Sequence, residues 1–378
     1  MARRVLFYVQ HLLGIGHLVR AVRIADALSS GFEVTLVVGG EVPAGLVPRD
    51  VEVVRLAPVK AGEGGFGALV HPDGRPFDPA DQAARRQVLL DTLDRLRPDI
   101  LLIEAFPFGR RQMRFELLPL LERARAAPAR PLVACSVRDI LQARRPDRDA
   151  ETLDLIRRFF DLVLVHGDPA YFPLAQSFPQ ADAIEAQLRY TGMVGPAAES
   201  LDPQPLAPDD PIDVIVSVGG GAVGADLVRA AVAAKPLSAL AEARWLVLTG
   251  PNLDPRTLGS TDDRIVMRGF DPRLPKRLAV ARVSISQAGY NTVVDLLSAG
   301  CRPVLVPFGR GGETEQTRRA EVLAEHGWAV MLAETALDPV ALAAAIDRAL
   351  ALRTERPAMA LQGAEVTRKI LERALEPG

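Results

Sequence analysis

Cysteine is scarce in this sequence, since the 378 residues include only Cys135 and Cys301. Two distant cysteines do not make a disulfide framework, so we expect buried free thiols in a reducing compartment. A net excess of charge is also missing, because 45 Lys and Arg residues stand against 47 Asp and Glu residues. The formal net charge of −2 gives no support for binding to nucleic acid.

Long hydrophobic runs are absent as well. No run of about 18 apolar residues occurs, so the sequence predicts no membrane-spanning helix. The apolar run after the basic start, residues 5–9, is shorter than the core of a signal peptide. We therefore expect a cytoplasmic protein, one that can still associate with the inner face of a membrane.

Several well-known catalytic motifs do not occur. The sequence has no G-x-x-x-x-G-K-[ST], G-x-S-x-G, H-E-x-x-H or C-x-x-C pattern. The dinucleotide fingerprint is incomplete, because Val19 stands where a third glycine should follow Gly14 and Gly16. We therefore predict neither a bound cofactor nor a resident metal.

Short apolar runs alternate with helical patterns in two series, which predicts parallel sheets with helices on both faces. The first series has a glycine-rich stretch, 60–78, that we interpret as a long loop. A stretch rich in proline and acid, 195–211, predicts a linker, after which the alternation restarts. Expected strands lie at 4–10, 32–40, 51–57, 98–106, 130–137 and 160–168, and then at 212–221, 244–250, 264–270, 281–289 and 302–308.

Two domains are therefore expected. An N-terminal Rossmann-like domain takes residues 1–194 and a second one takes residues 212–357, with the linker between them. The last segment, 358–378, has an amphipathic helical pattern and is expected to pack back on the N-terminal domain. In open parallel sheets, ligands bind beyond the carboxyl ends of the strands, so we expect the functional residues in the loops that follow strands.

The turn after the first strand reads HLLGIGHLVR (11–20) and brings His17 to the start of a helix. The helix dipole disfavours protonated imidazole there, and neutral imidazole is the form that a general base needs. Two carboxylates near strand ends, Glu104 and Asp139, are competing candidates for the base. The alternative interpretation is that His17 only caps the helix.

An anion site is indicated in the second half. A predicted strand ends in Gln287-Ala288-Gly289, and the backbone N–H groups of Gly289, Tyr290, Asn291 and Thr292 open the next helix. Asp295, one turn on, suits the hydroxyls of a ribose. Further along, Glu315 and Gln316 suit the hydroxyls of a sugar, although acids also favour helix N-termini for other reasons. Another strand is followed by Gly219, Gly220 and Gly221, which permit close approach of backbone to a ligand or form an ordinary turn.

These motifs resemble those of the two-domain GT-B glycosyltransferases, and within them the MurG-like group of glycosyltransferase family 28. The resemblance is carried by GIGHLVRAVRIADAL (14–28), SVGGG (217–221), AGYNTVVDLLSAGCRPVLVPF (288–308) and ETEQ (313–316). It implies two doubly wound Rossmann-like domains facing a cleft. It also implies that residues 289–292 bind a diphosphate, that Asp295 binds the ribose, that Glu315 and Gln316 bind the sugar, and that the backbone near Phe270 meets uracil.

The first loop has the form G-x-G-H-x-x-R, which is closer to a set of predicted glycosyltransferases and to PseG-like UDP-sugar hydrolases. The main hypothesis is an inverting, metal-independent transfer from a UDP-sugar to the hydroxyl of a small-molecule or lipid-linked acceptor. The alternatives are hydrolysis of the donor, with His17 activating water, and binding of a nucleotide sugar without catalysis. The arginines expected to bind an acidic or phosphate-bearing acceptor, or else to form surface ion pairs, are Arg20, Arg110, Arg111 and Arg138. Gly14 and Gly16 are also expected at the acceptor site.

Overall fold

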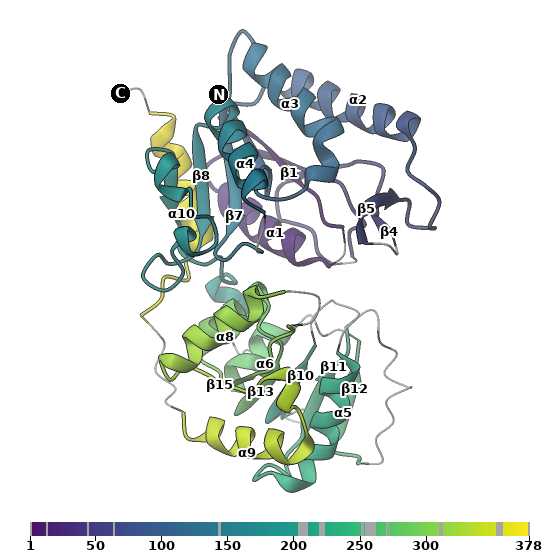
Figure 1. Ribbon diagram of the computed structural model, residues 1–378, viewed down its shortest axis with the longest axis vertical. Helices are drawn as coiled ribbons and strands as arrows, with labels where there is room; N and C mark the ends of the chain where they lie inside the picture. The colour runs from purple at the N-terminus through teal and green to yellow at the C-terminus, as the bar shows by residue number, and fades with distance from the viewer. Residues whose placement is uncertain are drawn as a thin grey trace. The chain divides into compact units, whose positions relative to one another are not determined.

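The computed structural model divides into two compact units, one of residues 1–194 with 360–378 and one of residues 195–359 (Figure 1). The first unit contains both ends of the chain. The structure describes residues 2–12, 14–43, 45–62, 65–142, 145–202, 211–218, 224–250, 253, 262–269, 271, 273–309, 313–352 and 358–376.

A parallel sheet of seven strands forms the centre of the first unit. All but the edge strands are short runs of buried apolar residues, as expected for a sheet covered on both faces. The strand order is β3-β2-β1-β6-β7-β8-β9. The strands are β1 (Arg4–Val9), β2 (Glu33–Val38), β3 (Glu52–Arg55), β6 (Ile100–Glu104), β7 (Leu132–Arg138), β8 (Leu162–His166) and β9 (Leu188–Tyr190).

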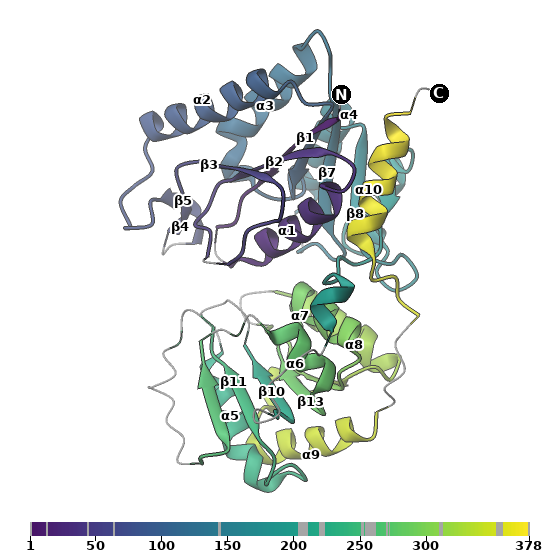
Figure 2. The ribbon, with the colours of Figure 1, turned by 180° about the vertical axis from the view of Figure 1, so that it is seen from behind.

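Helices cover both faces of this sheet, and the alternation along β1 shows how. Leu6 and Tyr8 pack in one core with α2 (Pro79–Leu96), α3 (Arg114–Ala126) and α4 (Pro146–Phe159). On the opposite face, Val5, Phe7 and Val9 pack with α1 (Gly16–Leu28) and α10 (Gly363–Ala374). The helix α10 runs beside α1 (Figure 2).

The prediction of a loop over 60–78 is wrong in its first half. Residues there form an antiparallel hairpin of β4 (Lys60–Gly62) and β5 (Gly65–Val70). Ala61 and Leu69, partners in this hairpin, both pack against the core of the unit. The glycines interrupt the two-residue alternation that would otherwise have indicated strands.

The second unit is built on a six-stranded parallel sheet of order β12-β11-β10-β13-β14-β15. Its strands are β10 (Val214–Ser217), β11 (Trp245–Leu248), β12 (Ile265–Arg268), β13 (Val283–Ser286), β14 (Pro303–Leu305) and β15 (Val330–Met331). The helices α5 (Ala225–Ala234) and α9 (Pro339–Leu350) share one core with this sheet. The remaining helices are α6 (Leu274–Val280), α7 (Tyr290–Ala299) and α8 (Glu315–Glu325).

Both sheets have a point where the strand order reverses, and such switch points are where open α/β sheets bind ligands. The order reverses between β1 and β6 in the first unit and between β10 and β13 in the second. The fold class predicted from the sequence, two doubly wound α/β domains, is therefore confirmed. Among the described helices, none combines the length and the apolarity needed to cross a bilayer.

Candidate functional site

His17 and Glu104 meet at the switch point of the first unit. His17 is the second residue of α1, which follows β1, and Glu104 is the last residue of β6. Nδ1 of His17 lies 3.0 Å from Oε1 of Glu104. The histidine side chain is 22 % exposed, whereas the Glu104 side chain is fully buried. His17 is thus held by a buried carboxylate and does not serve as a helix cap.

The charge of Glu104 is set by its partners. Burial alone raises the pKa of this carboxyl group, but the buried Arg20 guanidinium, which forms an ion pair with it, and the hydrogen bonds from His17 and Ser136 hold the pKa below its usual range. Glu104 is therefore a carboxylate and can only accept hydrogen bonds. It follows that Nδ1 of His17 carries the hydrogen and donates it, and that Nε2 carries the lone pair.

The same surroundings keep His17 neutral. Burial and the nearby positive charge of Arg110 lower the pKa of His17 to about 3, despite the hydrogen bond to Glu104. The sequence suggests neutrality from the helix dipole, and the structure adds desolvation as a cause. In the described part of the chain, Nε2 of His17 has no hydrogen-bond partner. This arrangement presents a neutral imidazole with a free lone pair, which is what general-base catalysis requires.

A second buried network supports the loop that leads to His17. The amide of Gln10 donates to the carbonyl oxygen of His11 over 2.7 Å, and its oxygen accepts from Nη2 of Arg85 over 2.5 Å. A Cβ atom at Gly39 would lie 1.9 Å from Oε1 of Gln10, and one at Gly40 would lie 2.5 Å from the His11 ring. The glycine pair at the end of β2 is therefore required by the close approach of this loop.

Four further residues of the first unit were predicted to belong to the site, namely Arg110, Asp139, Arg138 and Gly14. Arg110 adopts a left-handed backbone conformation and donates from Nε to the carbonyl oxygen of Gln10 over 2.7 Å, so it contacts the same loop. Asp139 is 1 % exposed and follows β7, where Arg138 is the last residue. A Cβ at Gly14 would meet no atom within 4 Å, so packing does not dictate glycine there.

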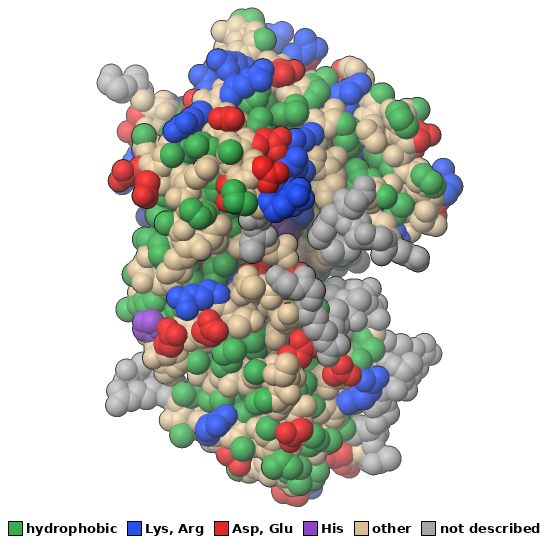
Figure 3. Space-filling model, in the orientation of Figure 1, with side chains coloured by type: hydrophobic (Ala, Val, Ile, Leu, Met, Phe, Trp, Pro, Cys, Tyr) green, Lys and Arg blue, Asp and Glu red, His purple; other side chains and the backbone are tan. Residues whose placement is uncertain are grey.

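The side chain of Arg111 is exposed at the surface. Its Nη1 pairs with Oε2 of Glu151 over 2.6 Å, and Arg114 pairs with the same carboxylate. On the face shown in Figure 3, blue Lys and Arg side chains lie beside red Asp and Glu side chains over the first unit. Arg158 with Glu122 and Arg130 with Asp161 are other ion pairs at the surface of this unit. The basic cluster at 109–114 thus contains at least two arginines engaged in an ion pair.

In the second unit, the edge at the switch point is formed by α7 and the loops before and after it. Gly289 has an extended backbone conformation (φ −63°, ψ 150°), and α7 begins at Tyr290 with no side chain capping its N-terminus. The dipole of this ten-residue helix favours an anion at this end. Asn291, Thr292 and Asp295 are half-buried residues of the same helix.

Gln316 of α8 holds two loops of this edge together. Oε1 of Gln316 accepts from the backbone N–H of Ala288 over 3.1 Å and from that of Phe308 over 3.2 Å. These two donors fix the orientation of the amide, so its NH₂ group is the part left to a ligand. Glu315, the first residue of α8, is 7 % exposed.

Arg319 is a contributor that the sequence did not reveal. It is fully buried, donates from Nη1 to the carbonyl oxygen of Ala288 over 2.8 Å and lies over the ring of Tyr290, 5.8 Å from its centroid. Its positive charge therefore lies close to the start of α7. An arginine in a helical pattern normally indicates a solvated surface, so no signal in the sequence marked it.

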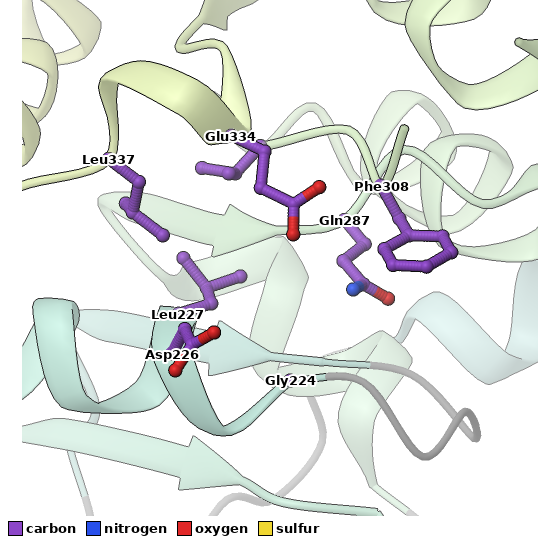
Figure 4. A pocket seen from close by; sticks show the side chains of 8 residues that line it. Gly224, Asp226, Leu227, Gln287, Phe308, Glu334 and Leu337 are labelled. Carbon is purple, nitrogen blue, oxygen red and sulfur yellow. The ribbon is translucent and has the colours of Figure 1, made fainter. Parts of the chain in front are cut away.

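A small pocket lies at the same edge. Figure 4 shows that the carboxylates of Asp226 and Glu334, the amide of Gln287 and the ring of Phe308 line it. Gln287 was predicted as a site residue, whereas the other three were not. The described residues that line the pocket are Gly224, Asp226, Leu227, Gln287, Val306, Phe308, Glu334 and Leu337. The predicted donor-site residues Gly219, Gly220, Gly221 and Phe270 lie outside the described residues.

Comparison with known proteins agrees with this geometry. Residues 215–373, which run from β10 into α10, match the model of the glycosyltransferase family 28 C-terminal domain. The second half of the chain is therefore similar to the C-terminal domain of family 28 glycosyltransferases. This confirms the resemblance inferred from the motifs at 217–221, 288–308 and 313–316.

The named relatives are transferases of one kind. A stretch of 163 residues, 42 % of the chain, is 33 % identical to a UDP-N-acetylglucosamine--N-acetylmuramyl-(pentapeptide) pyrophosphoryl-undecaprenol N-acetylglucosamine transferase of Synechococcus sp. (strain CC9605). The same name belongs to a relative from Exiguobacterium sp. (strain ATCC BAA-1283 / AT1b), 33 % identical over 37 % of the chain. The chain spans 44 % and 40 % of the lengths of these two curated relatives.

Solved structures show that the whole chain has the GT-B fold. The calicheamicin glycosyltransferase CalG4 matches with a TM-score of 0.63 and 19 % identity, over 99 % of this chain and 97 % of CalG4. MurG of Acinetobacter baumannii matches with a TM-score of 0.59 and 17 % identity, over 98 % of this chain and 99 % of MurG. At these identities the likeness establishes the fold, and the activity has to be argued from the site.

Proposed function

We propose that the protein is an inverting glycosyltransferase that moves a sugar from a UDP-sugar to an acceptor hydroxyl without a metal. The observation that carries this proposal is the pairing of His17 with the buried, ionised Glu104, which leaves a neutral imidazole nitrogen available as a base. The second half of the chain, which matches the family 28 C-terminal domain, would bind the donor.

The donor would bind at the edge of the second unit. The uncapped start of α7 favours the diphosphate, and the buried charge of Arg319 adds to this favourable potential. We assign the ribose hydroxyls to Asp295 and the sugar hydroxyls to Glu315, to the NH₂ group of Gln316 and to Gln287. Backbone near Phe270 and the glycines at 219–221 would complete the contacts to uracil and phosphate.

The reaction is a single displacement. Nε2 of His17 takes the proton of the acceptor hydroxyl while the acceptor oxygen forms a bond to the anomeric carbon. The bond from that carbon to the β-phosphate oxygen breaks, and its electron pair leaves with UDP, so the configuration is inverted. The N–H groups of residues 289–292 stabilise the growing negative charge of UDP, which is electrostatic stabilisation by preorganised donors.

Glu104 then acts through His17, as a partner for the imidazolium that forms, and it is too enclosed to be the base itself. The acceptor would be a small molecule or lipid-linked, and its acidic or phosphate groups would be met by Arg110 and Arg138. Gly14 and Gly16 would allow the acceptor to approach the loop closely. Arg20 would act indirectly, by keeping Glu104 ionised.

The proposal is tested with a panel of nucleotide sugars, with UDP-N-acetylglucosamine first because the curated relatives carry that donor in their names. A donor present at about 100 times its Kd should stabilise the protein by about 2.7 kcal/mol in thermal unfolding. UDP sugars should stabilise it more than dTDP sugars, and UDP release should need an added hydroxyl acceptor. Rapid UDP release without acceptor would instead make the protein a hydrolase, and the absence of any shift would contradict a nucleotide-sugar site.

Replacing Gly289 with alanine separates donor binding from folding. The backbone there is compatible with alanine, and the new Cβ would meet its first neighbour, Oγ1 of Thr292, at 3.9 Å. We therefore expect the free energy of unfolding to change by less than about 0.5 kcal/mol. The methyl group stands where the diphosphate must approach the N–H groups, so the Kd for UDP should rise about tenfold or more, measured by calorimetric titration. An unchanged Kd would remove α7 from the donor site.

The pH dependence of kcat/KM follows from the state of His17. An ordinary histidine titrates near pH 6.5, whereas the pKa of His17 is lowered to about 3 by burial and by Arg110. The base is active when neutral, so activity is lost only as the pH falls through that lowered pKa. We expect kcat/KM to stay level from about pH 7 to about pH 5, because the profile reports the free enzyme. An acid limb centred near pH 6.5 would contradict this assignment of the base.

A further inference from the structure

Behind Glu104, the first unit contains a chain of buried polar groups that the proposed reaction does not use. The hydroxyl of Ser136, on β7, contacts Oε2 of Glu104, and its Oγ lies 2.8 Å from Nε2 of His166, on β8. Nδ1 of His166 lies 2.8 Å from Oγ1 of Thr191. Ser136 and His166 are fully buried and Thr191 is 2 % exposed.

The ionisation of Glu104 fixes the direction of the hydrogen bonds that Ser136 makes in this chain. A carboxylate only accepts, so Ser136 must give its one hydroxyl hydrogen to Oε2 of Glu104. The oxygen of Ser136 must then accept from His166, which places a hydrogen on Nε2 of His166. Burial, together with the charge of Arg20, lowers the pKa of His166 to about 3, so its Nδ1 carries a lone pair and accepts from Thr191.

The same distances would also fit the opposite direction. In that case a protonated Glu104 would donate to Ser136, Ser136 to Nε2 of His166, and Nδ1 of His166 to Thr191. Thr191 would then donate to the carbonyl oxygen of Gly192, which lies 2.8 Å from its Oγ1. The buried ion pair with Arg20 decides between the two, because Arg20 has only donors and needs an ionised Glu104 beside it.

We infer that His166, with Ser136 and Thr191, is a positioning residue for the base. By occupying the acceptor side of Ser136, His166 directs the serine hydrogen to Glu104, and Glu104 in turn holds the hydrogen of His17 on Nδ1 and leaves Nε2 free. No proton moves along the chain. The charged groups that act on His17 are Glu104, Arg20 and Arg110, and those that act on His166 are Arg20, Glu104 and Asp139.

The inference rests on the proposed function for the role of His17, but the test of the chain needs no substrate. We would label the five histidines of the full-length protein with ¹⁵N and assign their ring nitrogens by NMR at neutral pH. The expected result is a neutral His17 with hydrogen on Nδ1 and a neutral His166 with hydrogen on Nε2. A hydrogen on Nδ1 of His166 would establish the opposite direction and overturn the inference.

A matched pair of threonine variants tests the far end of the chain. Thr191→Val removes the donor to Nδ1 of His166, so the ¹⁵N resonance of that nitrogen should move. Thr152, 4 % exposed in α4, donates to the carbonyl oxygen of Arg148 over 2.8 Å. Thr152→Val removes an equally buried hydroxyl in the same unit and should leave both histidines unchanged. Equal effects of the two variants would mean that the hydroxyl of Thr191 has no specific role.

The variant Ser136→Ala tests whether this chain of buried hydrogen bonds affects the reaction. With one acceptor oxygen of Glu104 left without its donor, the carboxylate no longer holds His17 in one orientation, so kcat should fall roughly tenfold with little change in KM. A kcat equal to that of the unmodified protein would show that the chain does not position the base. If the histidines have the expected hydrogens but no UDP-sugar is turned over, the proposed function fails while the chain stands.

Discussion

Replacing His17 with alanine is expected to lower turnover of a UDP-sugar by about 10²–10⁴-fold, the usual contribution of a general base. The loss should fall on kcat and kcat/KM alike, because the proton moves only in the transition state. The donor should bind as before, since we assign it to the second unit. Steady-state kinetics with the donor found in the nucleotide-sugar panel, together with a calorimetric titration of UDP, measure both quantities.

His326→Gln is the matched control. His326 is an exposed histidine at the end of α8, and its Nδ1 lies 2.8 Å from the carbonyl oxygen of Val322. Its loss should leave kcat within about twofold of the unmodified protein, since exposed substitutions usually have small effects. If His17→Ala retained full turnover while binding UDP normally, His17 would not be the base, and Asp139 would be the next candidate.

The fold was predictable, and a candidate site could be proposed, because both sheets are parallel and covered on both faces. Their central strands are continuous apolar runs bounded by helices, and ligands bind where such strands end. This reasoning led to His17, Gln287 and Gly289 without knowledge of the strand order. The hairpin at 60–70 escaped it because its glycines hide the alternation that marks an exposed strand.

The residues behind the site could not be predicted in the same way. Glu104 and Ser136 are partners in the register of β6 with β7, but that neighbourhood depends on the strand order, which the sequence does not reveal. His166 stands at the end of an apolar run, where a polar residue is normally the start of a loop, and Ser136 lies inside a strand where a serine gives no sign of its partners. Arg85, Gln10 and Arg319 become partners of distant groups only after folding, so their burial has no local signal.

Replacing Arg85 with methionine is the second large effect that we expect, and it concerns stability. Arg85 and Glu116 are fully buried, and Nε of Arg85 lies 2.8 Å from Oε2 of Glu116. The guanidinium also donates to the carbonyl oxygen of Gly39 over 2.8 Å and to the oxygen of Gln10. Methionine would fill much of the space but leave the carboxylate buried and uncompensated. The free energy of unfolding should therefore fall by about 3–5 kcal/mol, measured by urea denaturation.

The double variant Arg85→Met with Glu116→Leu shows whether the lost charge or the changed shape causes the loss of stability. Removing both members of a buried pair in favour of apolar side chains is often neutral, so the double variant should recover most of the stability. Tyr8 limits the recovery, because its hydroxyl donates to Oε1 of Glu116 over 2.5 Å and would lose its partner. Adding Tyr8→Phe should restore the remainder. If the triple variant were as unstable as Arg85→Met alone, the contacts of Arg85 with Gly39 and Gln10 would outweigh the ion pair, and this network would serve mainly to hold the loop that carries His17.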